Sequence, residues 1–516
     1  MFMKKITHTT AIIFCAASLL IFAHIEANAS DYYDAKTGTI HLREVAVGDA
    51  VYKRVSVGLG QVQSLAQGDP GAALSSYSLN SGLLSIPFIR VGTSAFTNAA
   101  VTITDVRHVE SELRSSTPLP SGETYGAFKA AVMAAWRQTP QFIDAANYQA
   151  QLRQLEASKT CVGFGSDDII PAPKTNLNWG GGVHVNTLYP MRTTNHQLVF
   201  TPVNTFPAPF VRVAIDANVY AQNDERVSQL RWALVDRLIH LGSANPNSAV
   251  REELRIHLLD YARANALSEG LLTNWSSTVT ANTPVHFEII PLSLNFIHAF
   301  SHAAPLFSPT ERQLVGDWLN RLVARVLTSA WSRNKQDNKV YFRSQVALAW
   351  GLVTGDSELV RNAITIYKHA INEIRPDGSF INESSRGGSA NLYQSQAADS
   401  VLSLAVSLEE NLGLPALNFQ VQGKSVWTAM GRVLDAYADQ VRIASQYGKS
   451  CEQGSFGSVA APDPRWGSNL QSISFLRVAL KREGLEGVPQ RIRTLPWVNY
   501  YYPEREGVDL VALLGD

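Results

Sequence analysis

The hydrophobic pattern of the chain changes near residue 120, and this change divides the sequence into two parts that must fold differently. Residues 31–115 carry short alternating runs rich in Val, Ile, Thr and Tyr, which are typical of β-strands. Residues 116–121 read Ser-Thr-Pro-Leu-Pro-Ser and indicate a linker. From Gly122 onward apolar residues such as Tyr125 and Phe128 recur at helical spacing. We therefore expect a β-rich part followed by a helical part.

The β-rich part, taken as residues 30–115, contains an internal repeat. The segment from Ile40 to Gly48 resembles the segment from Leu84 to Gly92, which lies 44 residues later. Two copies of one β unit predict a small accessory β domain. Such a domain could bind a partner or a glycan, or it could be a packing module, and we favour the packing module.

The helical part, residues 122–516, predicts a succession of paired amphipathic helices. They are expected at about 140–157, 225–242, 248–266, 286–303, 309–330, 341–354, 357–374, 390–411, 424–444 and 468–482. One of them has a clear start signal, because Ser308 can cap it, Pro309 follows and Glu311 lies in the first turn. Residues 158–223 are rich in Gly and Pro and indicate a long loop-rich insertion, of the kind that often carries function. We expect a mainly α fold, an (α/α) toroid of helical hairpins with a small N-terminal β-rich domain.

The first 29 residues have the pattern of a secretory signal peptide. Lys4 and Lys5 form a basic start, an apolar stretch runs from residue 11 to 23, and Ala27-Asn28-Ala29 resembles a cleavage site. The apolar stretch is short for a membrane span. We expect a periplasmic or secreted protein with no membrane insertion, whose oligomeric state the sequence leaves open.

Charge and cysteine content limit the possible partners further. The chain has 44 Lys and Arg against 44 Asp and Glu, so no global basic field is available to attract nucleic acid. Any positive charge for a polyanionic substrate must therefore be local. Cys15 lies in the signal, and export leaves Cys161 and Cys451, which could form a disulfide or stay as two separate buried thiols.

Two short segments of the helical part offer groups suited to proton chemistry. The first, Asp337-Asn338-Lys339-Val340-Tyr341-Phe342, provides an amide and an ammonium, and the second, residues 375–393, provides Arg386 and Tyr393. Removing a proton beside a carboxylate requires that the carboxylate be neutralised, that a base take the proton and that an acid protonate the leaving oxygen. Asn338, Lys339 and Arg386 suit the first task and a tyrosine can serve the others. The set indicates β-elimination on a uronic-acid polysaccharide without a metal or other cofactor.

The same residues resemble the alginate lyase superfamily over roughly residues 270–410. In its poly(mannuronate) lyases an Asn-Asn-His-x-Tyr-Trp motif is followed, after a helix, by an Arg and a Tyr seven residues apart, and here Tyr393 follows Arg386 by seven. The resemblance implies that Asn338 and Arg386 neutralise the carboxylate and that Tyr393 is the general acid, or both the acid and the base. Lys339 replaces the family's catalytic histidine, so it could be a neutraliser or a base. This departure widens the expected substrates from alginate or polymannuronate to uronate polymers such as glucuronan.

Four other residues are predicted to lie near the substrate. Tyr341 belongs to the first motif, and His286 and Glu288 stand where a helix is expected to begin and could border the cleft, although we favour a structural role for His286. Trp179 lies in the loop Asn178-Trp179-Gly180-Gly181-Gly182 and could face a sugar or be buried in a turn.

Three alternative interpretations remain open. His298 and His302 are four residues apart on one expected helix, a spacing that can bind metal, but no third ligand is near them in sequence. A glycoside hydrolase would use carboxylates such as Asp377, Glu383 or Asp399 as acid and base. A non-catalytic glycan-binding protein of polysaccharide export would bind without turnover.

Overall fold

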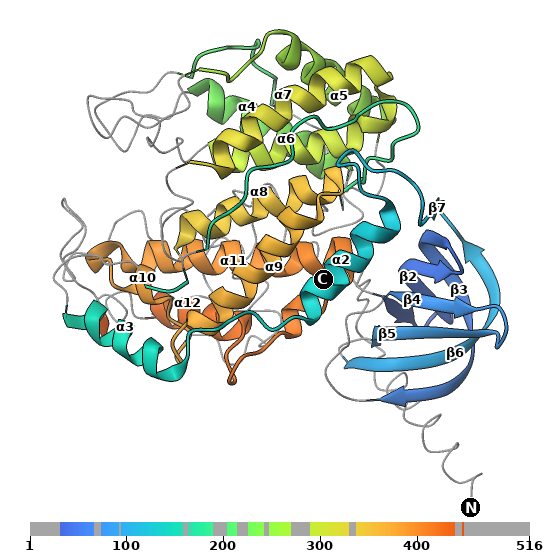
Figure 1. The fold of residues 1–516 in the computed structure, drawn as a ribbon, viewed down its shortest axis with the longest axis horizontal. Helices are drawn as coiled ribbons and strands as arrows, with labels where there is room; N and C mark the ends of the chain where they lie inside the picture. The colour runs from blue at the N-terminus through green and yellow to red at the C-terminus, as the bar shows by residue number, and fades with distance from the viewer. Residues whose placement is uncertain are drawn as a thin grey trace, which may run out of the picture.

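The computed structural model describes residues 31–66, 74–91, 94–157, 164–166, 168–188, 204–213, 225–241, 247–269, 289–329, 337–438 and 446–447. Within these residues the chain forms a β-barrel that stands beside a larger helical part (Figure 1). The predicted signal peptide, the helix expected at 468–482 and both Cys161 and Cys451 lie outside the described residues.

The barrel is built from consecutive strands of the N-terminal part. The strands are β1 (Tyr32–Asp34), β2 (Thr39–Val47), β3 (Ala50–Ala66), β4 (Ser75–Ser78), β5 (Leu83–Val91), β6 (Ser94–His108) and β7 (Ser111–Arg114). Strands β2, β4, β5, β6 and β3 pair in that order, and β3 pairs back with β2, so the sheet closes on itself. β1 pairs with both β2 and β5, and β7 extends the sheet along β3.

The two repeated segments occupy equivalent places in the barrel. They form β2 and β5, and each is followed by an antiparallel partner, β3 or β6. Ile40 and Leu42 of β2 correspond to Leu84 and Ile86 of β5, and all four are buried in the barrel interior. Equal spacing of inward-facing residues in two copies therefore builds one core from two similar hairpins.

The helical part contains both long helices and short turns. The α-helices are α2 (Tyr125–Arg137), α3 (Ala145–Ala157), α4 (Glu225–Leu241), α5 (Ser248–Arg263), α6 (Ile289–Ala303), α7 (Pro309–Leu327), α8 (Asn338–Thr354), α9 (Ser357–Glu373), α10 (Ile381–Ser384), α11 (Ala390–Leu412) and α12 (Val426–Ala438). The 3₁₀ turns are η1 (Ala304–Leu306), η3 (Gly387–Ser389) and η4 (Ala416–Asn418). Every residue of α6 is buried and α8 is buried except at Lys339, so these two helices lie at the centre of the helical core.

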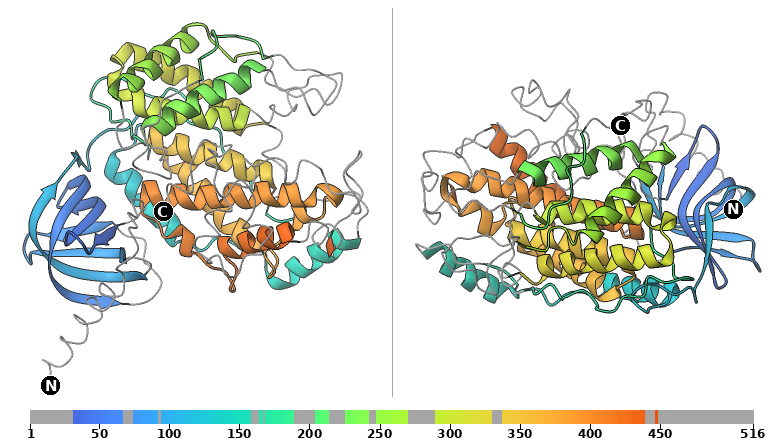
Figure 2. Two further views of the ribbon diagram at one scale, coloured as in Figure 1. Left: turned by 180° about the vertical axis from the view of Figure 1, so that it is seen from behind. Right: turned by 90° about the horizontal axis from the view of Figure 1, so that it is seen from above.

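The predicted fold class, mainly α with an (α/α) toroid, is wrong. A closed β-barrel accounts for the whole N-terminal part, so the chain combines a β-barrel with a helical part rather than adding a small β domain to a ring of helices. The main contacts of the described helices run from α4, α5 and α7 through α6 to α8, then to α9 and α11, and on to α12. They do not return from α12 to α4, as a ring would require, and two opposite views show α4–α7 at one end and α9, α11 and α12 at the other (Figures 1 and 2).

The barrel is attached to the helical part through buried ion pairs. Glu44 of β2 contacts Lys129 of α2 at 2.7 Å and accepts a hydrogen bond from the Tyr125 hydroxyl. Arg90 of β5 contacts Glu409 of α11 at 2.5 Å. Burial would raise the pKa of Glu44, but the neighbouring lysines outweigh it and hold that pKa at about 2.

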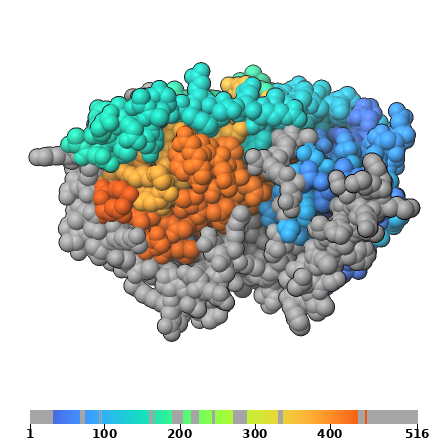
Figure 3. Space-filling view, turned by 90° about the horizontal axis from the view of Figure 1, so that it is seen from below, coloured from blue at the N-terminus to red at the C-terminus, as the bar shows by residue number. Residues whose placement is uncertain are grey.

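Part of the chain between α2 and α4 lies beside the C-terminal helices. Helix α3 and residues 168–188 border the surface formed by those helices, as the space-filling view from below shows in teal against orange (Figure 3). None of the described helices has the length and apolar character needed to cross a membrane.

Candidate active site

The first predicted motif forms the N-terminus of α8. Asp337 caps the helix, because its side chain accepts a hydrogen bond from the Val340 backbone at 3.1 Å. The Asn338 side chain donates from Nδ2 to Gln396 of α11 at 2.9 Å, and its Oδ1 is buried without a hydrogen-bond partner. Lys339 is the partly exposed residue of this turn, and its Nζ lies 3.7 Å from an Asp337 oxygen.

The second predicted motif begins with a tight turn after α9. Gly378 has a φ of 85°, a left-handed conformation that favours glycine. A Cβ at Gly378 would also lie 2.0 Å from the backbone oxygen of Thr428 in α12. The turn therefore needs a glycine for two reasons, and it leads directly into α10 and the η3 turn, where Glu383 and Arg386 are placed.

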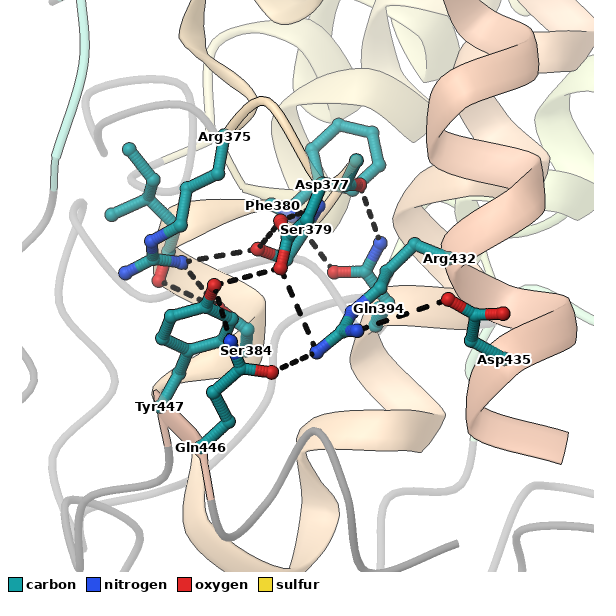
Figure 4. Close-up of polar contacts among 12 residues, drawn as sticks. Arg375, Asp377, Ser379, Phe380, Ser384, Gln394, Arg432, Asp435, Gln446 and Tyr447 are labelled. Carbon is teal, nitrogen blue, oxygen red and sulfur yellow. Dashed lines mark hydrogen bonds and ion pairs between the residues drawn. The ribbon is translucent and has the colours of Figure 1, made fainter. Parts of the chain in front are cut away.

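A network of polar contacts around Asp377 holds this turn in place (Figure 4). Asp377 accepts hydrogen bonds from Ser379, at 2.7 Å from its hydroxyl, and from the Tyr447 hydroxyl at 2.7 Å. Arg432 of α12 approaches the same carboxylate at 3.7 Å. Arg375 lies with its guanidinium 4.0 Å from the centre of the Tyr447 ring. Asp377 is therefore committed to contacts within the protein.

The two motifs meet at the carboxylate of Glu383. One of its oxygens accepts a hydrogen bond from the Asn338 backbone N–H at 2.6 Å, and the other lies 3.1 Å from Nε of Arg386. The Arg386 guanidinium in turn lies 4.1 Å from the centre of the Tyr393 ring. Burial raises the pKa of Glu383, while Arg386 opposes this effect. Asn338, Arg386 and Tyr393 are thus brought together, with Lys339 one residue after Asn338.

Two residues that were predicted to bind substrate are buried in the structure, and for Trp179 this is the second of the two alternatives given above. Trp179 is fully buried, and its ring packs against Phe300 at 5.3 Å and Trp350 at 5.6 Å between ring centres. Gly316 permits this position, because a Cβ there would lie 2.4 Å from the indole. Tyr341 is 2% exposed beside Phe380, and burial raises its pKa well above the ordinary value. Neither ring presents a face to a sugar.

The remaining predictions fall in two groups. His286 and Glu288 lie outside the described residues. His298 and His302 are both buried in α6, and burial lowers their pKa values to about 4 and about 3. Over the described ranges, no three His, Cys, Asp or Glu side chains gather in a way that could hold a metal ion.

Sequence reasoning missed a second buried acidic group near this region. Glu373, at the end of α9, accepts hydrogen bonds from the backbone and the hydroxyl of Ser166, and burial raises its pKa to about 7. His369, one turn earlier, lies 2.8 Å from Asp168. Helical spacing relates His369 to Glu373, but no sequence signal connects them with a loop some 200 residues earlier. Gln396 could have been found, because it follows Tyr393 by three positions on one helix.

Comparison with known proteins shows a similarity to one family. Residues 276–443, which are less than half of the chain, match the family profile described as alginate lyase. The matched segment contains both motifs, which confirms the resemblance predicted from them, and it leaves the barrel outside the match.

Several solved structures are similar to the chain at low identity. Alginate lyase A1-III from Sphingomonas species A1 is 18% identical, with 66% of this chain and 90% of that chain covered and a TM-score of 0.40. A complex of an A1-III variant with a tetrasaccharide is 18% identical, covering 68% and 93%, with a TM-score of 0.41. An alginate lyase from Bacteroides ovatus is 15% identical, covering 70% and 97%, with a TM-score of 0.39. These TM-scores are too low to carry an argument, so the assignment rests on the family match. A comparison with curated proteins gives no match.

Proposed function

We propose that this protein is a polysaccharide lyase that cleaves a uronic-acid polymer by β-elimination, with alginate as the first candidate substrate. The observation that carries the proposal is the convergence of Asn338, Arg386 and Tyr393 on one small region around Glu383. The family match supports an anionic polysaccharide as the substrate. Export to the periplasm or the medium and metal-independent catalysis are parts of the same proposal.

The proposed reaction assigns one task to each group. Asn338, Lys339 and Arg386 neutralise the uronate carboxylate, which stabilises the negative charge that develops when the C5 proton leaves. Tyr393 moves protons: it takes the C5 proton, or protonates the departing glycosidic oxygen, or does both in turn. The bond from C4 to the leaving oxygen breaks as the C4–C5 double bond forms. The guanidinium of Arg386 beside the Tyr393 ring favours the phenolate that takes the C5 proton and that is restored when the leaving oxygen is protonated.

The carboxylates that a hydrolase would use are poorly placed for that role. Glu383 is fully buried and Asp399 is 4% exposed. Asp377 accepts hydrogen bonds from Ser379 and Tyr447. An acid and base pair must instead face the two sides of a glycosidic bond.

The decisive experiment replaces the Tyr393 hydroxyl alone. With polymannuronate, polyguluronate and glucuronan as a panel, the wild type should release unsaturated ends that absorb ultraviolet light, and Tyr393→Phe should be slower by at least about a hundredfold. Tyr261→Phe is the matched control. The Tyr261 hydroxyl donates a hydrogen bond of 2.9 Å to the backbone oxygen of Pro207, and neither residue belongs to the two motifs. New reducing ends without ultraviolet absorbance would indicate hydrolysis, and a fully active Tyr393→Phe protein would refute the proposed mechanism.

The role of Lys339 can be tested with the residue that the family carries. If Lys339 neutralises the carboxylate, Lys339→His should keep activity on the same polymer or move it toward mannuronate. If Lys339 is the base, the acidic limb of the pH–rate profile should move toward the range of histidine. Binding of the polymers without turnover by the wild type would instead favour a glycan-binding protein.

A further inference from the structure

Glu383 is a side chain of the second motif that also contacts the first motif. It comes from α10, a helix of 4 residues, and it is fully buried. Its two oxygens are divided between the motifs: one accepts from the Asn338 backbone N–H at 2.6 Å and the other lies 3.1 Å from Arg386 Nε. The two oxygens of one carboxylate therefore contact two different elements.

Burial opposes the negative charge of Glu383, and neighbouring groups stabilise that charge. Removing a carboxylate from water is costly unless it is paired and hydrogen-bonded. Three groups supply this compensation: Arg386 and Lys339 carry positive charge nearby, and the Asn338 N–H donates directly. Asp337 acts against them as a second acidic group. Each of these contacts lowers the free-energy cost of burying the carboxylate. The groups that make the contacts are therefore held in place together.

An ordinary helix-surface ion pair does not explain this contact. Arg386 follows Glu383 by three positions, a spacing that often gives exposed pairs of little energetic value. Here the Glu383 side chain is 0% exposed and that of Arg386 is 15% exposed. The Glu383 carboxylate also accepts a hydrogen bond from the first turn of α8, 45 residues away in sequence. Glu383 therefore connects two separate elements and does not simply form an ion pair on the surface of one helix.

We infer that Glu383 is a positioning residue, which acts on the substrate carboxylate through Arg386 and the N-terminus of α8 without touching the substrate. It holds the Arg386 guanidinium near α8 through the ion pair at Nε, and it holds the Asn338 backbone through the hydrogen bond from its N–H. This inference rests on the proposed function, because it assumes that Arg386 binds the uronate carboxylate.

The test is a double-mutant cycle between Glu383 and Arg386, read as the dissociation constant of a mannuronate tetrasaccharide by calorimetry. Glu383→Gln keeps an oxygen for the Asn338 N–H but places an amide against Arg386, so binding should weaken by about tenfold or more, the usual scale for a displaced charge contact. In an Arg386→Gln background the same change should have almost no further effect. Glu383→Asp keeps the charge but is one methylene shorter, so its loss should be intermediate.

Glu409→Gln is the matched control for loss of a buried carboxylate. Glu409 is also buried and paired with an arginine, Arg90, but at the contact between the barrel and α11. It should lower the melting temperature without changing the dissociation constant. Equal weakening by Glu383→Gln with and without Arg386 would overturn the positioning role, as would unchanged binding by Glu383→Gln. If Arg386→Gln alone leaves both binding and turnover intact, the proposed function fails, whatever Glu383 does.

Discussion

The buried carboxyl group of Glu373 should make the helical part less stable as the pH rises. Glu373 is 4% exposed and accepts hydrogen bonds from Ser166, and its second oxygen is buried without a hydrogen-bond partner. Burial raises its pKa from 4.5 to about 7, an effect that the Ser166 contacts and the nearby His369 only partly offset. The folded protein therefore holds the proton of Glu373 more tightly than the unfolded chain does.

The expected magnitude follows from the two pKa values. A group with a raised pKa in the folded state contributes stability that is complete below its unfolded pKa, here 4.5, and is lost as the pH rises through about 7. The difference corresponds to about 3 kcal/mol over the whole range. Between pH 5 and pH 8 about 2.5 kcal/mol of it should disappear. Glu373→Gln removes the titration while keeping a hydrogen-bond acceptor for Ser166.

The assay compares urea unfolding of the wild type and Glu373→Gln at several pH values. Tryptophan fluorescence reports the helical part selectively, because all 10 tryptophans lie at or after Trp136. Taking the difference between the two proteins cancels the other titrating groups. The wild type should lose about 2.5 kcal/mol relative to the variant between pH 5 and pH 8. A difference that is constant with pH, or that changes in the opposite direction, would refute the reasoning.

Three further predictions concern packing, the barrel contact and metals. Gly316→Ala should lower the free energy of unfolding by about 1–3 kcal/mol in urea titration, because the new methyl group meets the Trp179 ring at 2.4 Å; an unchanged midpoint would show that the indole can move. Lys129→Met should cost about 3 kcal/mol or more in thermal unfolding by removing the ion pair of the buried Glu44, and adding Glu44→Leu should recover much of that loss. Chelator treatment should leave turnover intact, and activity lost to chelator and restored by a divalent ion would contradict the metal-independent mechanism.

Local signals predicted the helices well because each signal acts over a few residues. The helix expected at 357–374 is α9, Ser357–Glu373, and the start signal at Ser308 is a complete capping box with Glu311. Amphipathic spacing and capping chemistry are both properties of neighbouring residues, so they can be read without knowledge of the fold.

Closure of the barrel could not be predicted in the same way. The repeat indicated two similar β units, but closure depends on pairings between distant strands, such as β2 with β4 and β1 with β5. Hydrogen bonds of this kind leave no pattern within either strand. The direction of a side chain is also set by distant partners: Trp179 is buried because Gly316 lies opposite it, and a glycine-rich loop gives no sign of that.

The residues of the candidate site could be predicted from the sequence, but the contacts between them could not. The sequence allowed Asn338, Arg386 and Tyr393 to be selected, because the spacing within each motif spans no more than two helical turns. That Glu383 joins them depends on the turn around Gly378, which brings α10 against the start of α8. Tyr341 shows the limit of motif reasoning, since it belongs to the first motif but its side chain is buried.

The arrangement of charges at the two motifs explains how a chain with equal numbers of acidic and basic residues can bind a polyanion. Each cation has a carboxylate beside it: Lys339 lies 3.7 Å from Asp337, and Arg386 lies 3.1 Å from Glu383. The side-chain exposures are 22% and 15% for the cations but only 9% and 0% for the carboxylates. The carboxylates therefore lie deeper than the cations, so an anionic polymer that approached this surface would meet the cations first. Because Coulomb energy falls with distance, this layering attracts a carboxylate at a site whose four charges sum to zero.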